Sequence, residues 1–137
     1  MYKCEYFDIK ELVPESMYQK YGELSWQFFD VNLLKVLDRL REQFGPLHVN
    51  NWYNDGPFSQ RGIRDFDYGG IDNRSLHKFG KAVDFHSNTV CSEDIREYIL
   101  NYKDEFPEIG GMELGTSWVH IDTRNVDGII TFRPGAI

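Results

Sequence analysis

Two histidines and one aspartate stand out in this sequence of 137 residues as a candidate set of metal ligands. His77 and Asp84 lie seven residues apart in the segment SLHKFGKAVDF, and His120 lies in the later segment WVHID. Two imidazole nitrogens and one carboxylate oxygen leave a tetrahedral zinc ion one open position for water. The three residues therefore predict a hydrolytic zinc centre.

The residues around the three candidate ligands indicate how the chain would position them. Gly80 lies between the first two ligands and would allow a sharp turn, because glycine adopts positive φ at no steric cost. Segment 81–85 is typical of a strand, and its alternation would turn Asp84 toward a cleft and its two neighbours toward a core. The same alternation in segment 118–122 puts three side chains on one face: Trp118, His120 and Asp122.

A non-haem iron(II) site also uses two histidines and one carboxylate. In such oxygenases the carboxylate follows the first histidine by one or two residues on a strand. The gap of seven residues between His77 and Asp84 favours zinc over iron.

The motifs SxHxxGxAxDF and WVHID together resemble those of the zinc D-Ala-D-Ala peptidase and hedgehog family, in particular its small phage-encoded members. The resemblance extends more weakly to segments 50–64 and 123–134. It implies that His77, Asp84 and His120 bind zinc. It also implies a peptidase that cleaves peptidoglycan stem peptides as a carboxypeptidase, a dipeptidase or an L-Ala-D-Glu endopeptidase.

Amide hydrolysis also requires a general base that takes a proton from the attacking water. Many relatives in this family place that acid three residues before the last histidine, where this chain has Ser117. Glu113 is the nearest upstream carboxylate and our candidate base, because phage-encoded relatives carry a glutamate near this place. Asp122 is the alternative, although we expect it to orient an imidazole or an arginine instead.

Arg64 matches the family's arginine that binds a substrate carboxylate, a task that suits the planar fork of a guanidinium group. Arg61 is the alternative in the same RGIR segment. Ser75 is a second candidate for substrate binding, although it could equally cap a turn. Trp118 is a third candidate, although an aromatic residue beside a strand more often packs against a core.

The remaining sequence predicts three helices. Asp30 is the expected N-cap of a helix whose apolar spacing continues to Phe44, where Gly45 and Pro46 follow. A shorter helix is expected after Pro14, and another is expected after a cap at Ser92.

Strand patterns occur in segments 47–52, 81–85, 118–123 and 128–132, of which the last two are expected to form an antiparallel pair. These patterns do not alternate regularly with the helices, which indicates an α+β domain with helices packed on one antiparallel sheet, similar to the fold of the D-Ala-D-Ala peptidase and hedgehog family. The irregular segment 53–74 leads into His77, and we expect it to form a wall of the site.

The composition predicts one domain over residues 1–137 and disfavours several classes of function. The net charge of -7 disfavours sequence-independent nucleic-acid binding, and no apolar stretch suggests membrane insertion. The start of the chain lacks the apolar region of a signal peptide, so we expect a monomer made in the cytoplasm, with two free thiols at Cys4 and Cys91. The resemblance implies a phage or prophage origin and action on the cell wall after release.

A non-enzymatic alternative remains open at this point. Hedgehog proteins show that this fold can keep its metal and serve binding, so the chain could be a catalytically silent, zinc-containing phage structural or binding protein. The serine at position 117, where many relatives carry the catalytic acid, favours this alternative.

Overall fold

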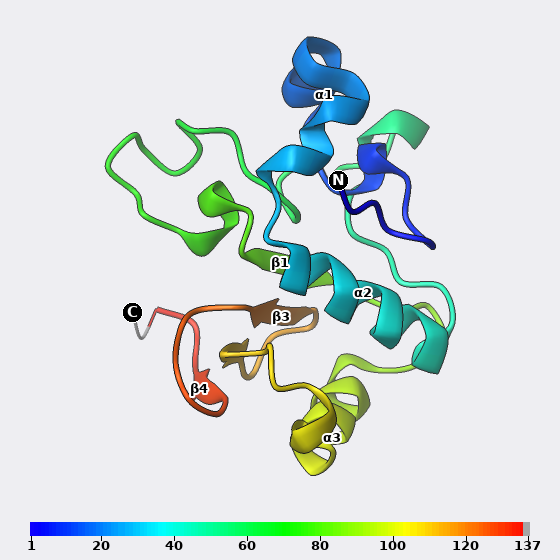
Figure 1. The fold of residues 1–137 in the computed structure, drawn as a ribbon, viewed down its shortest axis with the longest axis vertical. Coiled ribbons are helices and arrows are strands. Elements are labelled where there is room, and N and C mark those ends of the chain that lie inside the picture. The colour runs from blue at the N-terminus through cyan, green and yellow to red at the C-terminus, as the bar shows by residue number, and fades with distance from the viewer. Residues whose placement is uncertain (136–137) are drawn as a thin grey trace.

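The computed structural model describes residues 1–135 and has an α+β architecture. Three α-helices accompany a four-stranded mixed sheet: α1 (Glu15–Tyr21), α2 (Val31–Phe44) and α3 (Ser92–Asn101). In Figure 1, α1 lies at one end of the long axis and α3 at the other, with α2 and the sheet between them. Five short 3-10 helices complete the helical elements: η1 (Ile9–Glu11), η2 (Gly22–Phe28), η3 (Trp52–Asn54), η4 (Leu76–Phe79) and η5 (Lys103–Glu105).

The sheet has the strand order β1-β3-β2-β4. Its strands are β1 (Ala82–Phe85), β2 (Gly111–Glu113), β3 (Val119–Asp122) and β4 (Ile130–Phe132). β3 pairs antiparallel with both β1 and β2, whereas β4 pairs parallel with β2. The predicted α+β class is confirmed, but the prediction of a wholly antiparallel sheet is wrong.

The expected antiparallel pair of the last two strands is also wrong, because β3 has no free edge. Its two edges are hydrogen-bonded to β1 and β2, so β4 passes it and pairs with the outer edge of β2. The parallel register aligns Ile130 with Gly111 and Phe132 with Glu113. This connection brings Phe132 to the row of residues that includes the candidate base.

The predicted strand over segment 47–52 is reduced to one isolated bridge between His48 and His86. The neighbouring backbone groups have partners outside the sheet. The N–H of Asn50 donates to the carbonyl of Glu11, and that of Asn51 donates to Phe58. This segment therefore joins the sheet to the N-terminal region and does not extend the sheet.

The predicted helices are confirmed with small differences at their ends. The Asp30 carboxylate caps α2 by accepting from the N–H of Asn32, and Gly45 ends the helix at a φ of 79°. The helix after Ser92 forms, but its N-cap is Cys91, because the Ser92 hydroxyl donates to the carbonyl of Ser117 instead.

The core lies between the helices and one face of the sheet. The apolar stripe of α2 is fully buried, as are apolar residues of β1, β2, β3 and α3: Leu33, Leu34, Val36, Leu37, Leu40, Val83, Phe85, Ile95, Ile99, Met112, Val119 and Ile121. Cys4 is buried and Cys91 is exposed, and both are free thiols. Among residues 1–135, no helix is both long enough and apolar enough to span a bilayer.

Candidate metal centre

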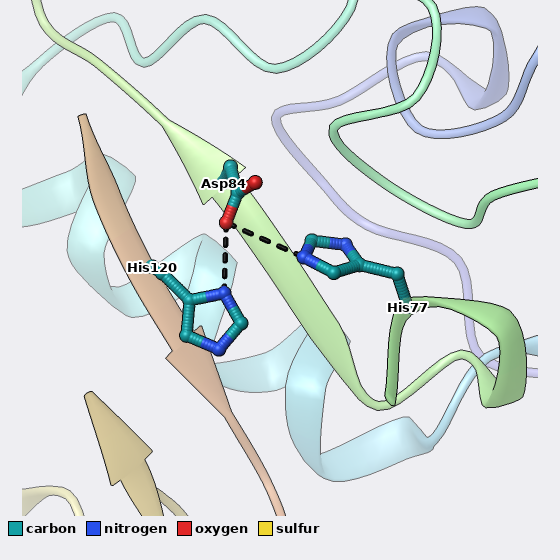
Figure 2. Close-up of side chains that lie close together, drawn as sticks. All are labelled: His77, Asp84 and His120. Atoms are coloured by element: carbon teal, nitrogen blue, oxygen red, sulfur yellow. Dashed lines mark hydrogen bonds and ion pairs between the residues drawn. The ribbon is translucent and has the colours of Figure 1, made fainter. Parts of the chain in front are cut away.

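The three predicted ligands meet although they come from different elements. Figure 2 shows His77 on η4, Asp84 on β1 and His120 on β3, with their side chains pointing toward one another. One ligand atom from each residue lies within 4.8 Å of the other two. The three side chains therefore form a group that could hold a metal ion.

One of the two separations to Asp84 fits a shared small cation, and the other is shorter. Two ligand atoms at about 2.0–2.2 Å from a tetrahedral zinc ion lie roughly 3.3 Å apart. Nε2 of His77 is 3.4 Å from Oδ1 of Asp84, and Nδ1 of His120 is 2.8 Å from the same oxygen. The first separation matches coordination, and the second is the length of a hydrogen bond.

Local geometry explains how η4 delivers His77 beside β1. Gly80 follows the helix with a φ of 70°, and a Cβ at this position would collide with the carbonyl of Phe28. Glycine is therefore required at this turn for two independent reasons. The hydroxyl of Ser75 accepts from the N–H of His77 at 3.3 Å, so Ser75 is the N-cap of η4.

A main-chain carbonyl fixes the orientation of the His77 ring. Nδ1 of this buried side chain is 2.9 Å from the carbonyl oxygen of Gly62, which can only accept a hydrogen bond. Nδ1 therefore carries a proton, and Nε2 is the ring nitrogen that faces Asp84. Sequence reasoning missed this anchor, because a backbone acceptor has no residue type that marks it.

Gly62 can lie this close only because it has no side chain. A Cβ on Gly62 would overlap the backbone of Leu12. The carbonyl of Leu12 accepts from the N–H of Ile63, the residue after Gly62, at 2.9 Å. The glycine lets the loop pack against the N-terminal segment and brings its carbonyl to His77.

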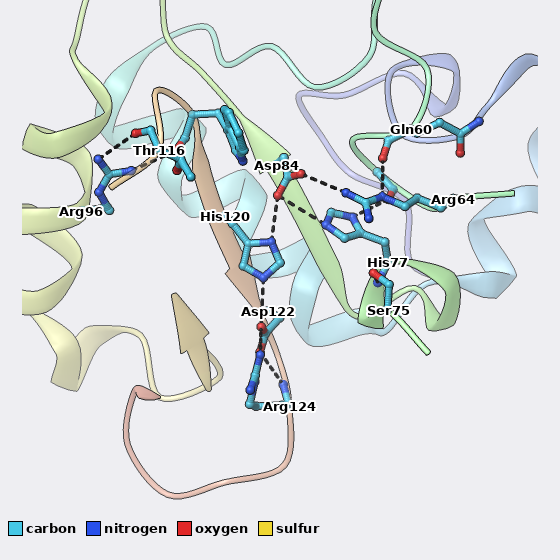
Figure 3. A network of polar contacts seen from close by, with 12 residues as sticks. Gln60, Arg64, Ser75, His77, Asp84, Arg96, Thr116, His120, Asp122 and Arg124 are labelled. Atoms are coloured by element: carbon cyan, nitrogen blue, oxygen red, sulfur yellow. Dashed lines mark hydrogen bonds and ion pairs between the residues drawn. The ribbon is translucent and has the colours of Figure 1, made fainter. Parts of the chain in front are cut away.

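Side chains, in contrast, hold His120 (Figure 3). Its Nε2 is 3.1 Å from Oδ2 of Asp122, a fully buried residue. Arg124 donates to both oxygens of that carboxylate, from Nε at 2.8 Å and from its terminal nitrogen at 2.7 Å. Asp122 thus contacts both an imidazole and an arginine. No sequence motif indicated that Arg124 would hold the Asp122 carboxylate.

Gly111 makes room for this pair of charged groups. It lies opposite Asp122 in the antiparallel register of β2 and β3. A Cβ at this position would overlap the Asp122 carboxylate and approach Nε of Arg124. The ring of Phe132 also packs on the guanidinium, with its centroid 5.0 Å from Cζ of Arg124.

Glu113 lies in β2, a strand that is not among the segments predicted from the sequence. It ends β2, where it is paired with His120, which is paired in turn with Asp84 across β1 and β3. Directly opposed residues in antiparallel strands share one face of the sheet. The candidate base and two of the candidate ligands therefore form one row across three strands.

The row faces a cavity of about 770 Å³ that also includes the other predicted site residues. Arg64, Ser75 and Trp118 all line it, as do Asn73 and Arg74 from the long loop. The expectation that this loop forms a wall of the cavity is thus confirmed for its C-terminal part.

The two candidate arginines of the RGIR segment lie in different surroundings. Arg61 does not line the cavity; its terminal nitrogen contacts Nδ1 of His86 at 2.9 Å, and its guanidinium lies over the ring of Phe58. Arg64 does line it, with one nitrogen 3.4 Å from Oδ2 of Asp84 and its Nε donating to the carbonyl of Gln60 (Figure 3). Geometry therefore favours Arg64.

The carboxylates and imidazoles of the group are electrostatically coupled, and a metal ion would have to displace the proton held by His120. Burial alone would raise the pKa of Asp84, but hydrogen bonds from His120 and His77 outweigh it and hold the pKa well below its usual range. Burial likewise opposes a charge on His120, but Asp122 and Asp84 raise its pKa to about 9. Burial would also raise the pKa of Asp122, yet Arg124 and His120 lower it to about 2. Both carboxylates are thus ionised at neutral pH.

Comparison with known proteins adds no assignment to this geometry. No family model matches the chain, and neither the curated proteins nor the solved structures gave a match.

Proposed function

We propose that the protein is a zinc-dependent peptidase that cleaves peptidoglycan stem peptides. One observation carries this proposal: the ligand atoms of His77, Asp84 and His120 converge within 4.8 Å in a cavity, and the row formed by Asp84 and His120 continues to Glu113. The resemblance to the D-Ala-D-Ala peptidase and hedgehog family supplies the substrate class.

The donor set suits zinc. His77 would bind through Nε2, because Gly62 accepts from its other nitrogen, and His120 would bind through Nδ1, because Asp122 lies at its Nε2. Asp84 would add one oxygen, which completes an N, N, O set. When bound, zinc would lower the pKa of a water molecule and polarise the carbonyl of the scissile amide.

Glu113 is suited to the role of proton carrier. It lines the cavity beside His120, and within residues 1–135 its carboxylate has no hydrogen-bond partner or ion-pair partner. The carboxylate is therefore available to accept a proton from the attacking water and to donate it to the leaving nitrogen.

Arg64 is suited to bind a carboxylate of the substrate. A guanidinium group has five N–H donors, and Gln60 and Asp84 engage only part of them. Its remaining donors could form a bidentate pair with a peptide carboxylate. Trp118 and Ser75 line the same cavity and would contact the rest of the substrate.

The test is hydrolysis of a synthetic stem peptide that carries no glycan, by zinc-loaded protein. We expect cleavage that a chelator abolishes, and a fall of about 10²–10⁴-fold in Glu113→Gln with the zinc content unchanged. The matched control is Glu97→Gln, an exposed glutamate on α3, which should cleave at the wild-type rate. Full activity in Glu113→Gln would exclude Glu113 as the base and make Asp122 the candidate.

The position of the cleaved bond can be determined from the products and from variants of Arg64. If Arg64 binds a terminal carboxylate, Arg64→Lys should lower kcat/KM without loss of metal, because an ammonium group lacks the planar fork. Wild-type kinetics in Arg64→Ala would point to an endopeptidase, in which no terminal carboxylate is bound.

The second candidate function is a zinc-containing phage structural or binding protein without catalytic activity. Ser117, at the position where many family members carry the catalytic acid, favours it. Full zinc occupancy combined with no cleavage of any stem peptide would establish this alternative over the peptidase.

A further inference from the structure

A second cavity, of about 420 Å³, lies among α1, η1 and η3, and none of its lining residues lines the cavity of the metal centre. Its size falls within the range of small-molecule sites, which is roughly 300–1,000 Å³. Its lining combines aromatic side chains with charged and amide groups. This combination restricts the chemistry of a ligand.

Three aromatic rings form one part of the lining. The ring of Trp52 is 6.1 Å from that of Tyr18 and 5.7 Å from that of Tyr53. The indole N–H of Trp52 donates to the carbonyl of Val13 at 2.8 Å, which fixes the ring before any ligand arrives. Tyr53 is 37% exposed, so part of this aromatic surface is open to solvent.

The polar groups of the lining retain hydrogen-bonding capacity. Lys10, Glu15 and Asp55 line the same cavity, yet within residues 1–135 none of them forms an ion pair. Nζ of Lys10 lies 5.1 Å over the ring of Tyr18, and Glu15 has a long contact of 3.4 Å with Gln19. A positively charged donor and two negatively charged acceptors are thus available to one ligand.

These features together favour a saccharide. The C–H groups on one face of a pyranose ring carry partial positive charge, which suits the negative face of an aromatic ring. Each hydroxyl group both donates and accepts, so it can pair with a carboxylate, an amide or an ammonium group. We infer that this second cavity binds a neutral pyranose unit of an oligosaccharide. The inference does not need the peptidase activity, although a glycan contact would help such an enzyme to hold its substrate.

Binding can be measured by NMR titration with a trimer of N-acetylglucosamine and, in parallel, with a trimer of glucose. A pyranose of about 15 non-hydrogen atoms should bind with a dissociation constant on the order of 1 mM. We expect shifts of the amide signals of α1 and η3 with at least one of the two trimers. No shift in these elements with either trimer would overturn the inference.

Two variants test the lining without disturbing the half-buried indole of Trp52. Tyr53→Ala and Glu15→Gln should each weaken binding by about fivefold or more, a change of roughly 1 kcal/mol. The matched control is Tyr102→Ala, an aromatic residue that is 52% exposed just after α3, which should bind as the wild type does. Unchanged binding in both lining variants would contradict the inference.

Two further measurements distinguish a saccharide site from a cation site and from the metal centre. Tetramethylammonium tests a cation-binding aromatic cage; shifts at η3 with this cation and with neither trimer would show that the cavity binds cations instead. His120→Ala should retain trimer binding, and Tyr53→Ala should cleave glycan-free stem peptide at the wild-type rate. A failure of the saccharide inference can therefore be distinguished from a failure of the proposed peptidase function.

Discussion

The two histidines of the candidate metal centre are anchored in different ways. His77 donates to a main-chain carbonyl, that of Gly62, whereas His120 contacts a carboxylate that Arg124 holds through two hydrogen bonds. Both rings then meet at Oδ1 of Asp84. A main-chain anchor can be displaced but not deleted by substitution, whereas a side-chain anchor can be removed atom by atom.

Both anchors nevertheless depend on a glycine. Gly62 lets its own carbonyl approach by packing on the backbone of Leu12, and Gly111 leaves space for Asp122 and Arg124. The difference lies in what the glycine serves. On the His77 side it permits the packing of a loop, and on the His120 side it permits a buried ion pair.

The largest effect is expected at the point where the two sides meet. Asp84→Ala removes the oxygen that faces both imidazoles and should abolish stoichiometric zinc binding in calorimetry. Asp94→Ala, an exposed aspartate in the first turn of α3, is the control and should bind as the wild type does. Retained binding in Asp84→Ala would mean that the metal uses other residues.

The side-chain anchor should produce the next largest effect on affinity. Asp122→Asn should weaken zinc binding by about 10–100-fold, because such partners orient the ligating imidazole. Arg124→Met should have a smaller effect in the same direction, since it acts through Asp122. Arg74→Met is the control, because Arg74 lines the same cavity but donates to the carbonyl of Ile71. Equal losses in Arg74→Met and Arg124→Met would indicate a general charge effect.

A substitution at the main-chain anchor should lower stability more than it lowers zinc affinity, the reverse of what is expected for Asp122→Asn. Gly62→Ala adds a methyl group against the Leu12 backbone and should lower the free energy of unfolding by about 1–3 kcal/mol, measured with denaturant. Its effect on zinc affinity should be smaller than that of Asp122→Asn, because the carbonyl is shifted and not lost.

Gly45→Ala separates stability from site geometry. This glycine ends α2 at a φ of 79° with open space around it, so alanine adds strain but meets no neighbour. It should destabilise the fold by roughly 1–2 kcal/mol and leave zinc affinity unchanged. If its zinc affinity fell as far as that of Gly62→Ala, the anchor described for His77 would be wrong.

The smallest effect is expected at the cap of η4. Ser75→Ala removes the hydroxyl that accepts from the N–H of His77 at 3.3 Å, and should cost about 0.5–1 kcal/mol of stability. Zinc affinity, measured by isothermal titration calorimetry, should change less in Ser75→Ala than in Gly62→Ala. A severe loss of hydrolysis with normal zinc binding would instead assign Ser75 to the substrate.

The sequence predicted the helices well because they depend on local patterns, and it predicted the ligand group because two separate motifs and the family resemblance named the same three residues. The apolar spacing of α2 and the cap at Asp30 are recognisable within one segment. The convergence of His77 and Asp84 was predictable because a glycine turn links the two residues, and alternation within β3 gave the orientation of His120.

Long-range pairing could not be predicted in the same way. The position of β4 depends on which strand edges are free once β3 is paired on both sides. The residue types of β4 do not indicate which strand it will pair with. The anchor at Gly62 is a carbonyl that every residue possesses. Arg124 became significant only when the register placed Gly111 beside Asp122.

The most direct test of the metal centre is the zinc content of the purified protein, measured by elemental analysis beside that of His120→Ala. We predict about one zinc ion per wild-type chain and no stoichiometric zinc in the variant, with the fold of both checked by circular dichroism. A His120→Ala protein that folds and still holds one zinc ion per chain would contradict the assignment of the metal centre.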